Sequence, residues 1–403
     1  MKILIASSSP CDKGGGISSY AKELCEGLIE KGHKIVFLSP SPENHSWLSE
    51  NNISFYPINR SENAESAIKQ IIKIIKDQSV EAIINNDNTF VQLTAPIIDC
   101  PFISVVHSSR TNILSLACFN HEWIDYIVTI SNDMMDKVIN KFDIPITKTP
   151  IIYNGVKAPK NTSVNNKDNN DKLKIIFNGG NKKHKGAHLI LSALSKYKSV
   201  FNNTEIHWFG YLPGDWDKKL SQYDCVLNHG RVPRDEMLSH LSKADIFLLP
   251  SSFEGCPMSL LEAMSFGLVP IVSDGEGAMP NIVTNGIEGM KCYLNNWEKQ
   301  IAESITQLNT NRALLKRMKE NSYTRFQQDF QRSDTINRLL FHIDNPIVNR
   351  NNKPEIIQLL KWHRPFRKDM KKAPFIDRIF IKLGLLRKDK KIKTKTIVSN
   401  IKG

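Results

Sequence analysis

The sequence predicts an α/β protein of two doubly wound domains in series, which face one another across a central cleft. Apolar strand-like segments alternate with helix-patterned segments along residues 1–157, a polar stretch interrupts them at 158–172, and the alternation resumes to residue 330. Such alternation is typical of parallel sheets covered by helices on both faces. A chain of 403 residues is also too long for one ordinary hydrophobic core.

The first domain, residues 1–157, is expected to begin with a strand in MKILIAS and a Gly/Ser loop at 10–19. The helix predicted at 20–31 has apolar residues at helical spacing and ends at Gly32. The following elements are the strand KIVFLS, a helix at 64–77, the strands EAIIN, FISVVH and YIVTIS, the helix NDMMDKVINKF and a strand in TPIIYN.

Residues 158–172 are polar and are interpreted as a linker. In the second domain, residues 173–330, the expected strands are KIIFNGG, EIHWFG, VLNHG, DIFLLPS and VPIVSD. Its expected helices lie at 186–199, 213–223, 234–243, 258–267, 278–285, 297–308 and 311–328. Residues 331–403 are expected to form C-terminal helices and a basic tail, part of which returns to the first domain.

The excess positive charge lies at the C-terminus. Residues 346–403 hold 17 Lys and Arg against 4 Asp and Glu, which leaves 37 basic and 37 acidic residues in the rest of the chain. A neutral body argues against nucleic acid as a partner, because a nucleic-acid-binding domain presents a basic face. The seven cysteines show no metal-binding spacing and resemble reduced thiols, which predicts a cytoplasmic protein.

Residues 250–277 combine two carboxylates with the start of a helix. Glu254 lies in a Gly/Pro loop after an apolar strand, and Glu262 lies eight residues later, about two turns into the next helix. A helix N-terminus offers unpaired N–H groups and partial positive charge to a phosphate, and a neighbouring carboxylate can accept hydrogen bonds from sugar hydroxyls. The segment therefore predicts a nucleotide-sugar site.

Two loops are candidates for phosphate binding. Gly15 and Gly16 lie in a strand-to-helix turn, where glycine lets the backbone approach a phosphate or sugar, although a flexible turn is an equal explanation. Lys182, Lys183 and Lys185 precede a predicted helix and can pair with a diphosphate, but each alone also fits a solvated basic turn.

His107 ends the strand FISVVH and is expected at the cleft. There it could hydrogen-bond a sugar hydroxyl or a reacting oxygen. A structural role is the alternative for a single histidine at a strand end.

Several segments, in this order, resemble the retaining glycosyltransferases of family 4, which have the GT-B fold of two Rossmann-like domains. The resemblance covers roughly residues 1–330, and the E-x7-E block within a strand–loop–helix is its most specific part. The matching segments are GGGISSYAKELCEGLIEKGHKIVFLS, YIVTISNDMMDKV, IIYNGV, GGNKKHKGAHLILSAL, HGRVPRDEMLSHLSKADIFLLPSSFEGCPMSLLEAMSFGLVPIVSD and GAMPNIVTNGIEGM.

The resemblance implies a set of donor-binding residues. Glu254 would bind hydroxyls of the donor sugar, and Glu262 would bind the ribose of the nucleotide. Backbone amides at Met258 and Ser259 would line the sugar and phosphates. Lys185 would pair with the diphosphate.

The resemblance also implies roles on the acceptor side. Gly15 and Gly16 would admit the diphosphate and the acceptor, and His107 would lie near the transferring sugar. Arg231 lies next to the usual place of the base. Glu254, His107 and Lys185 are thus expected nearest the reaction, with Glu254 binding the sugar rather than attacking it.

One position departs from the family pattern. Many members have an arginine directly after the glycine that ends the first strand of the second domain, and here that place is Gly180. Lys182 or Lys183 would then supply the second positive charge, as a point charge without the fork of a guanidinium. The implied reaction retains anomeric configuration and stabilises the leaving diphosphate without a metal or cofactor.

The C-terminal tail has two explanations. In FIDRIFIKLGLLRKDKKIKTK, apolar residues gather on one side of a basic helix, which is typical of an element that lies on anionic membrane. A helix packed on the body with a basic end is the alternative. In the first case residues 370–403 would hold the protein at the inner face of the cytoplasmic membrane, close to a lipid-linked acceptor.

The leading functional hypothesis is transfer of a sugar from a nucleotide-sugar to a saccharide or lipid-linked acceptor in cell-surface polysaccharide synthesis. A nucleotide-sugar epimerase and a non-catalytic partner on the same fold are the alternatives. The epimerase requires acid/base residues around C2 of the sugar, and the sequence shows none beyond the two glutamates. The non-catalytic alternative conflicts with the presence of Glu254, Glu262 and Lys185, while Gly180 favours it slightly.

Overall fold

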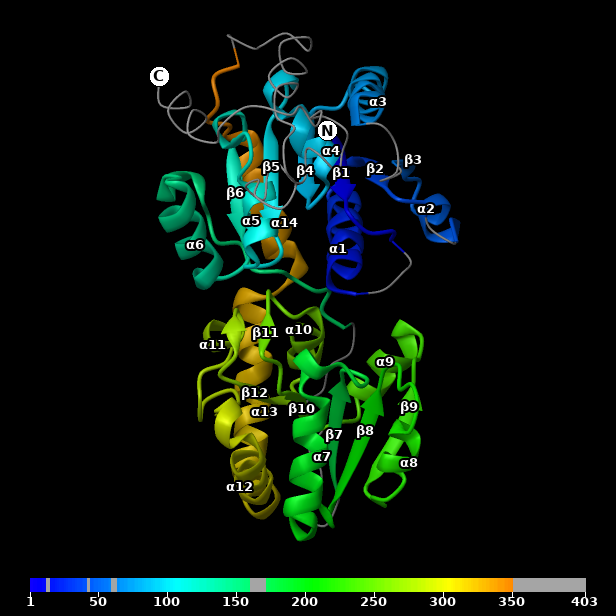
Figure 1. Cartoon of the computed structure of the whole chain (residues 1–403), viewed down its shortest axis with the longest axis vertical. Coiled ribbons are helices and arrows are strands. Elements are labelled where there is room, and N and C mark those ends of the chain that lie inside the picture. Colours follow the sequence, from blue (N-terminus) through cyan, green and yellow to red (C-terminus); the bar gives the residue numbers. More distant parts are fainter. Residues whose placement is uncertain (12–14, 42–43, 59–63, 160–171, 351–403) are drawn as a thin grey trace, which may run out of the picture. The chain divides into compact units, whose positions relative to one another are not determined.

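The computed structural model describes residues 1–11, 15–41, 44–58, 64–159 and 172–350, and divides the chain into two units (Figure 1). Unit 1 contains residues 1–128, 137–150 and the described residues from 340 onward, and unit 2 contains 129–136 and 151–339. Each unit has a six-stranded sheet with helices, which confirms the predicted α/β class. Most of the predicted linker and nearly all of the basic tail lie outside the described residues.

The sheet of unit 1 has the order β3-β2-β1-β4-β5-β6, with a crossover between β1 and β4. Its strands are β1 (Lys2–Ser7), β2 (Lys34–Ser39), β3 (Ser54–Pro57), β4 (Ala82–Asn86), β5 (Phe102–Val106) and β6 (Tyr126–Thr129). The helices of this half of the chain are α1 (Gly16–Glu30), α2 (Ser46–Glu50), α3 (Ala64–Asp77), α4 (Thr89–Thr94), α5 (Thr111–Ala117) and α6 (Asn132–Phe142).

The sheet of unit 2 has the order β14-β12-β10-β7-β8-β9. Its strands are β7 (Leu173–Asn178), β8 (Thr204–Phe209), β9 (Val226–Gly230), β10 (Ile246–Leu249), β12 (Val269–Ser273) and β14 (Met290–Cys292), and β11 (Phe253–Glu254) pairs separately with β13 (Glu276–Gly277). Its helices are α7 (Ala187–Lys196), α8 (Trp216–Leu220), α9 (Arg234–Leu241), α10 (Met258–Ser265), α11 (Met279–Ile282), α12 (Trp297–Thr310), α13 (Arg312–Asp329) and most of α14 (Arg332–Asp344).

Continuous apolar runs form the central strands. The side chains from Ile3 to Ala6 in β1 are fully buried, and those from Ile246 to Leu249 in β10 are at most 1% exposed. Both faces of a parallel sheet are covered, so its inner strands need no polar face. Such continuous apolar runs can be recognised in the sequence, and they are the reason that these central strands could be predicted from it.

Two differences from the predicted elements concern short segments. The predicted strand in TPIIYN is wrong, because this segment contributes only one isolated bridge, between Ile151 and Thr129. The sequence analysis also missed several elements that are too short for a periodic pattern or lie in less regular segments. These are α2, α4, α5, β3, β11, β13 and β14.

The chain returns to unit 1 after residue 339. The hydroxyl of Tyr126 donates a hydrogen bond to the carbonyl of Asn345 at 2.7 Å. The backbone N–H groups of Ile347 and Val348 donate to Asp125 Oδ1 at 3.0 and 2.9 Å, and Arg350 forms an ion pair with the same carboxylate. A buried aspartate thus holds residues 347–350 against the starts of β5 and β6. None of the described helices has the length and apolar character needed to cross a bilayer.

Candidate functional site

Lys185 and Glu254 form an ion pair at one edge of the sheet of unit 2. Lys185 ends a single 3-10 turn, Lys183–Lys185, after β7, and Glu254 ends β11, after β10. Because β7 and β10 are adjacent parallel strands, both loops leave the sheet at its carboxyl edge. Lys185 Nζ donates to Glu254 Oε1 at 2.6 Å, and the side chains are 21% and 10% exposed. A bound anion could therefore compete with Glu254 for this ammonium group.

Close backbone packing holds the two loops that carry this ion pair. Gly186 has a φ of +74°, and a Cβ at this position would lie 2.2 Å from the carbonyl oxygen of Pro250. Gly277 has a φ of +103°, and a Cβ there would lie 1.7 Å from the carbonyl oxygen of Glu254. A side chain at Gly186 would push the loop of Lys185 away from the loop after β10, and a side chain at Gly277 would displace Glu254, so the separation of Lys185 and Glu254 depends on both glycines.

Helix α10 begins at Met258, four residues after Glu254, and carries the second glutamate. The N–H groups of Met258 and Ser259 belong to the first turn, which has no partners within the helix. Glu262 is the fifth residue of α10, so the predicted distance of two turns into the helix is wrong and one turn is correct. Arg234, the first residue of α9, donates from Nη2 to Glu262 Oε1 at 2.9 Å.

Gly180 occupies a place where a side chain cannot fit. Its φ is +56°, and a Cβ would lie 2.6 Å from the carbonyl oxygen of Tyr211. Conversely, a Cβ on Gly210 would lie 2.5 Å from the backbone nitrogen of Gly180. Trp208 Nε1 donates to the carbonyl of Gly180 at 3.1 Å and fixes this crossing. The crossing gives a physical reason for the absence of the arginine that the resembling family usually has here.

The remaining basic candidates of unit 2 are exposed or partly exposed. Lys182 and Lys183 are exposed, and neither forms an ion pair with any described residue. The Arg231 guanidinium lies 5.3 Å from the ring centroid of Tyr211, which is 60% exposed. The structure therefore brings Lys185 and Glu254 together, and Glu262 with Arg234, but it pairs neither Lys182 nor Lys183 with them.

In unit 1, His107 lies at the end of β5 among uncharged groups. Its Nε2 is 3.1 Å from Asn86 Oδ1 at the end of β4, and its ring meets that of Tyr20 from α1 edge-on, with centroids 4.7 Å apart. Burial lowers the pKa of His107 to about 4, so the imidazole is neutral at pH 7. A neutral ring can donate or accept a single hydrogen bond according to its tautomer.

The first turn of α1 follows the glycine loop. Gly15 precedes the helix with a φ of +104°, a conformation that favours glycine, and Gly16 is the first helical residue. A Cβ at either position would meet no atom within 4 Å among the described residues. The positive φ thus explains why residue 15 is a glycine. Close packing within unit 1 does not explain a glycine at either position, since a side chain would meet no described atom there.

Asp87 is a residue of this region that the sequence analysis missed. It follows β4 directly, is 8% exposed and has a φ of +56°. Its Oδ1 and the Nδ2 of Asn86 are buried and have no hydrogen-bond partner within the described part of the chain. Burial raises the pKa of Asp87 to about 7. A strained, buried and titratable residue that directly follows Asn86, the partner of His107, is typical of a functional site, and its position at a strand end was the available signal.

Each unit thus gathers polar groups at the carboxyl edge of its sheet, with different chemistry. Unit 2 offers an ammonium group and a helix N-terminus that can bind an anion, and carboxylates that can accept hydrogen bonds from hydroxyls. Unit 1 offers a neutral imidazole and a carboxyl group that titrates near neutrality. Such groups can orient a hydroxyl and exchange a proton with it.

Two family models match the chain. Glycosyltransferase Family 4 matches residues 14–158, and Glycosyl transferases group 1 matches residues 160–325. Together the models include the candidate site residues of both units.

Among curated proteins, the chain is 24% identical over 216 residues to glycogen synthase of Mycobacterium tuberculosis, which covers 49% of this chain and 52% of the relative. It is 24% identical over 202 residues to lipopolysaccharide 1,6-galactosyltransferase of Escherichia coli, which covers 48% and 53%. The chain therefore spans about half the length of these curated relatives. The crystal structure of Anabaena HepE in complex with UDP is similar over 86% of this chain and 100% of its own, with a TM-score of 0.69 and 15% identity.

Proposed function

The chain belongs to the family 4 glycosyltransferases, glycosyl transferases group 1, and from this membership we propose its reaction. It transfers a sugar from a nucleotide-sugar to a saccharide or lipid-linked acceptor in lipopolysaccharide or other cell-surface polysaccharide synthesis, with retention of anomeric configuration. The similarity to a lipopolysaccharide galactosyltransferase supports this acceptor class. The similarity to HepE, which was solved with UDP and with UDP-glucose, supports a uridine donor as the first choice to test.

The ion pair between Lys185 and Glu254 carries the proposal. An ammonium group 2.6 Å from a carboxylate, in loops held by two glycine contacts, is partly desolvated and fixed in place. A diphosphate that binds at the start of α10 would draw the ammonium from Glu254 and leave that carboxylate to accept hydrogen bonds from the sugar. Donor binding thus replaces the ion pair of Lys185 with Glu254 by an ion pair of Lys185 with the diphosphate.

In the transfer step, the bond between the anomeric carbon and the diphosphate oxygen breaks, and the electron pair goes to the diphosphate. Lys185 and the amides of Met258 and Ser259 stabilise that charge as it develops. The acceptor hydroxyl attacks the same face of the sugar, and its proton passes to the leaving phosphate oxygen. No metal is needed for this charge stabilisation, so added Mg²⁺ or Mn²⁺ should change the initial rate by less than about twofold.

Unit 1 contributes neutral groups to this reaction. His107 hydrogen-bonds a hydroxyl of the sugar or acceptor, because its imidazole is uncharged at pH 7. Gly15 and Gly16 leave space above the first turn of α1 for the acceptor or the diphosphate. The membrane role predicted for residues 370–403 stays a prediction, because those residues lie outside the described structure.

A thermal-shift screen of the full chain tests donor binding. UDP, UDP-glucose, UDP-galactose, GDP-mannose and ADP-glucose should be compared at equal concentration, since a ligand that binds only the folded state raises the Tm. We expect one nucleotide class to raise the Tm and its sugar conjugate to be consumed when acceptor is present. Absence of a shift with every nucleotide would contradict the proposal and favour a non-catalytic partner. Release of free epimer from the donor would favour an epimerase.

A further inference from the structure

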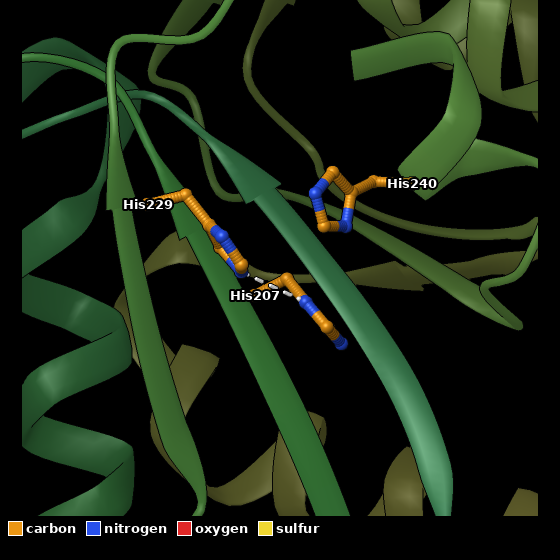
Figure 2. A group of neighbouring side chains, drawn as sticks. All are labelled: His207, His229 and His240. Carbon is orange, nitrogen blue, oxygen red and sulfur yellow. Dashed lines mark hydrogen bonds between the residues drawn. The ribbon is translucent and has the colours of Figure 1, made fainter. Parts of the chain in front are cut away.

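Three histidines of unit 2 meet although they are far apart in the sequence. His207 lies on β8, His229 on the neighbouring edge strand β9 and His240 on α9, and Figure 2 shows their rings turned toward a common space. One ring nitrogen from each can be chosen so that all three lie within 4.8 Å of one another. In the described part of the chain, this is the one group of three metal-ligating side chains with such spacing.

The three rings are packed as a cluster. His207 Nδ1 and His229 Nε2 are 2.9 Å apart, and these two rings are nearly parallel. The His240 ring lies 4.6 Å from His229 and 5.4 Å from His207, measured between centroids. Phe209 stacks on His229 at 4.6 Å and supplies an apolar wall. The rings are therefore held by packing and have little freedom to turn away.

Carboxylates lie beside two of the histidines. Glu205 Oε2 is 3.7 Å from His207 Nε2, and Glu236 Oε1 is 4.0 Å from His240 Nε2. Metal-ligating histidines commonly hold a carboxylate at the nitrogen that does not bind the ion, which orients the ring and increases its basicity. In His207 this arrangement leaves Nδ1 turned toward the cluster. Lys174 Nζ lies 3.7 Å from Glu205 and is the one described cation paired with that carboxylate.

The distances suit a small divalent ion. Zinc binds imidazole nitrogen at about 2.0–2.1 Å, and in a tetrahedral site this separates two ligand nitrogens by roughly 3.4 Å. The 2.9 Å between His207 Nδ1 and His229 Nε2 is shorter than this value, and the limit of 4.8 Å for all three nitrogens is longer, so movement of the side chains would complete the geometry.

We propose that His207, His229 and His240 bind one divalent transition-metal ion, with zinc as the best match to three imidazoles and an open fourth position. The ion cross-links β8, β9 and α9. Arg231 lies in the loop between β9 and α9, and Arg234 is the first residue of α9, so the ion would restrain both. Arg234 in turn donates a hydrogen bond to Glu262. The site has a structural role beside the donor-binding residues, takes no part in sugar transfer and does not depend on the proposed donor.

Metal binding should be measured on the untagged full chain, because a histidine tag would bind the same ions. After removal of metals with a chelator, Zn²⁺ titration by calorimetry should give one equivalent, and the Tm should rise with Zn²⁺ but not with Mg²⁺, which prefers oxygen ligands. Plasma mass spectrometry after dialysis should find one zinc per chain.

Substitution of single ligands identifies the site. His240→Gln, on the surface helix α9, should weaken zinc binding by at least about tenfold. His229→Gln should have the same effect, whereas His188→Gln, an exposed histidine on α7, should bind as the wild type does. If His240→Gln retains wild-type stoichiometry and affinity, or the wild-type chain binds no stoichiometric Zn²⁺, the proposal is wrong. Circular dichroism of each metal-free variant checks that the fold is intact.

Discussion

The candidate residues of each unit lie at the carboxyl edge of its own sheet, and the two sheets are similar. The polar groups of unit 2 are kept charged, whereas the surroundings in unit 1 favour the neutral forms. In unit 2 the side chains of Lys185, Glu254 and Glu262 are between 10% and 21% exposed, and each is part of an ion pair. In unit 1 burial lowers the pKa of His107 and raises that of Asp87, so the charged form of each is disfavoured. Pairing preserves charge for an anionic donor, whereas desolvation removes it where a neutral hydroxyl is expected.

The largest expected effect is on kcat, and it follows from removal of the positive charge of Lys185 in unit 2. Lys185→Gln should reduce kcat of sugar transfer by about 10²- to 10³-fold, as does loss of one preorganised group that stabilises a leaving oxygen. Initial rates with the donor found in the thermal-shift screen measure this.

Lys196→Gln is the matched control, because Lys196 also forms an ion pair with a glutamate in unit 2, with 3.4 Å between Nζ and Oε1 of Glu298. That pair is on the surface and its loss should change kcat by less than about twofold. An equal loss of activity in both variants would mean that Lys185 has no special place in the reaction.

A smaller effect should separate the two glutamates. Glu262→Gln should weaken binding of the bare nucleotide about tenfold, the value of one hydrogen bond to a charged group. Glu254→Gln should leave nucleotide affinity nearly unchanged and lower turnover. Arg234→Gln should also weaken binding of the bare nucleotide, as Glu262→Gln does. This substitution removes the arginine that donates a hydrogen bond to the Glu262 carboxylate at 2.9 Å and orients it.

Calorimetric titration of the nucleotide into each variant measures these affinities. If Glu254→Gln loses as much nucleotide affinity as Glu262→Gln, the assigned division between sugar and ribose is incorrect.

The last expected effect concerns stability and tests the description of unit 1. Because the folded pKa of Asp87 is raised to about 7 from an ordinary 3.8, the folded state binds more protons than the unfolded state between these values. Wild-type stability contributed by Asp87 is therefore complete below pH 4 and is lost as the pH rises through 7. Asp87→Asn should gain free energy of unfolding relative to wild type by about 1.4 kcal/mol per pH unit in this window.

Urea unfolding of both proteins at pH 5.5 and 6.5 tests the sign. The lowered pKa of His107 gives the opposite slope in both proteins and cancels in the difference. A difference that does not change with pH would show that Asp87 is ionised in the folded state as it is in the unfolded state.

Much of the fold could be predicted because the buried strands are apolar and the helices have clear periodicity. The helices at 64–77 and 132–142 and the strand at 226–230 have the predicted bounds. Helix α14 lies within residues 331–403, for which C-terminal helices were expected, although the bounds of those helices were not predicted. Short helices such as α4 and α5 have too few turns to show a period.

The candidate site was predicted less completely than the fold. Positions at the carboxyl ends of strands can be read from the sequence, so Lys185, Glu254 and His107 were identified. The pairing of Lys185 with Glu254 could not be predicted, because these residues are 69 positions apart and their contact depends on the order of strands in the sheet. The same limit hid the histidine cluster, whose members are single residues in three separate segments.

The crossing of Gly180 and Gly210 also constrains how this protein can change. A Cβ on Gly210 would lie 2.5 Å from the backbone nitrogen of Gly180, and a Cβ on Gly180 would lie 2.6 Å from the carbonyl oxygen of Tyr211, so neither position can accept a larger residue without a backbone shift. A lineage that acquires an arginine at position 180 must already have reshaped the connection between β8 and α8. Position 180 and the β8–α8 connection are therefore epistatic, and exchange of the whole connection together with residue 180 is the practical route for grafting the missing guanidinium group.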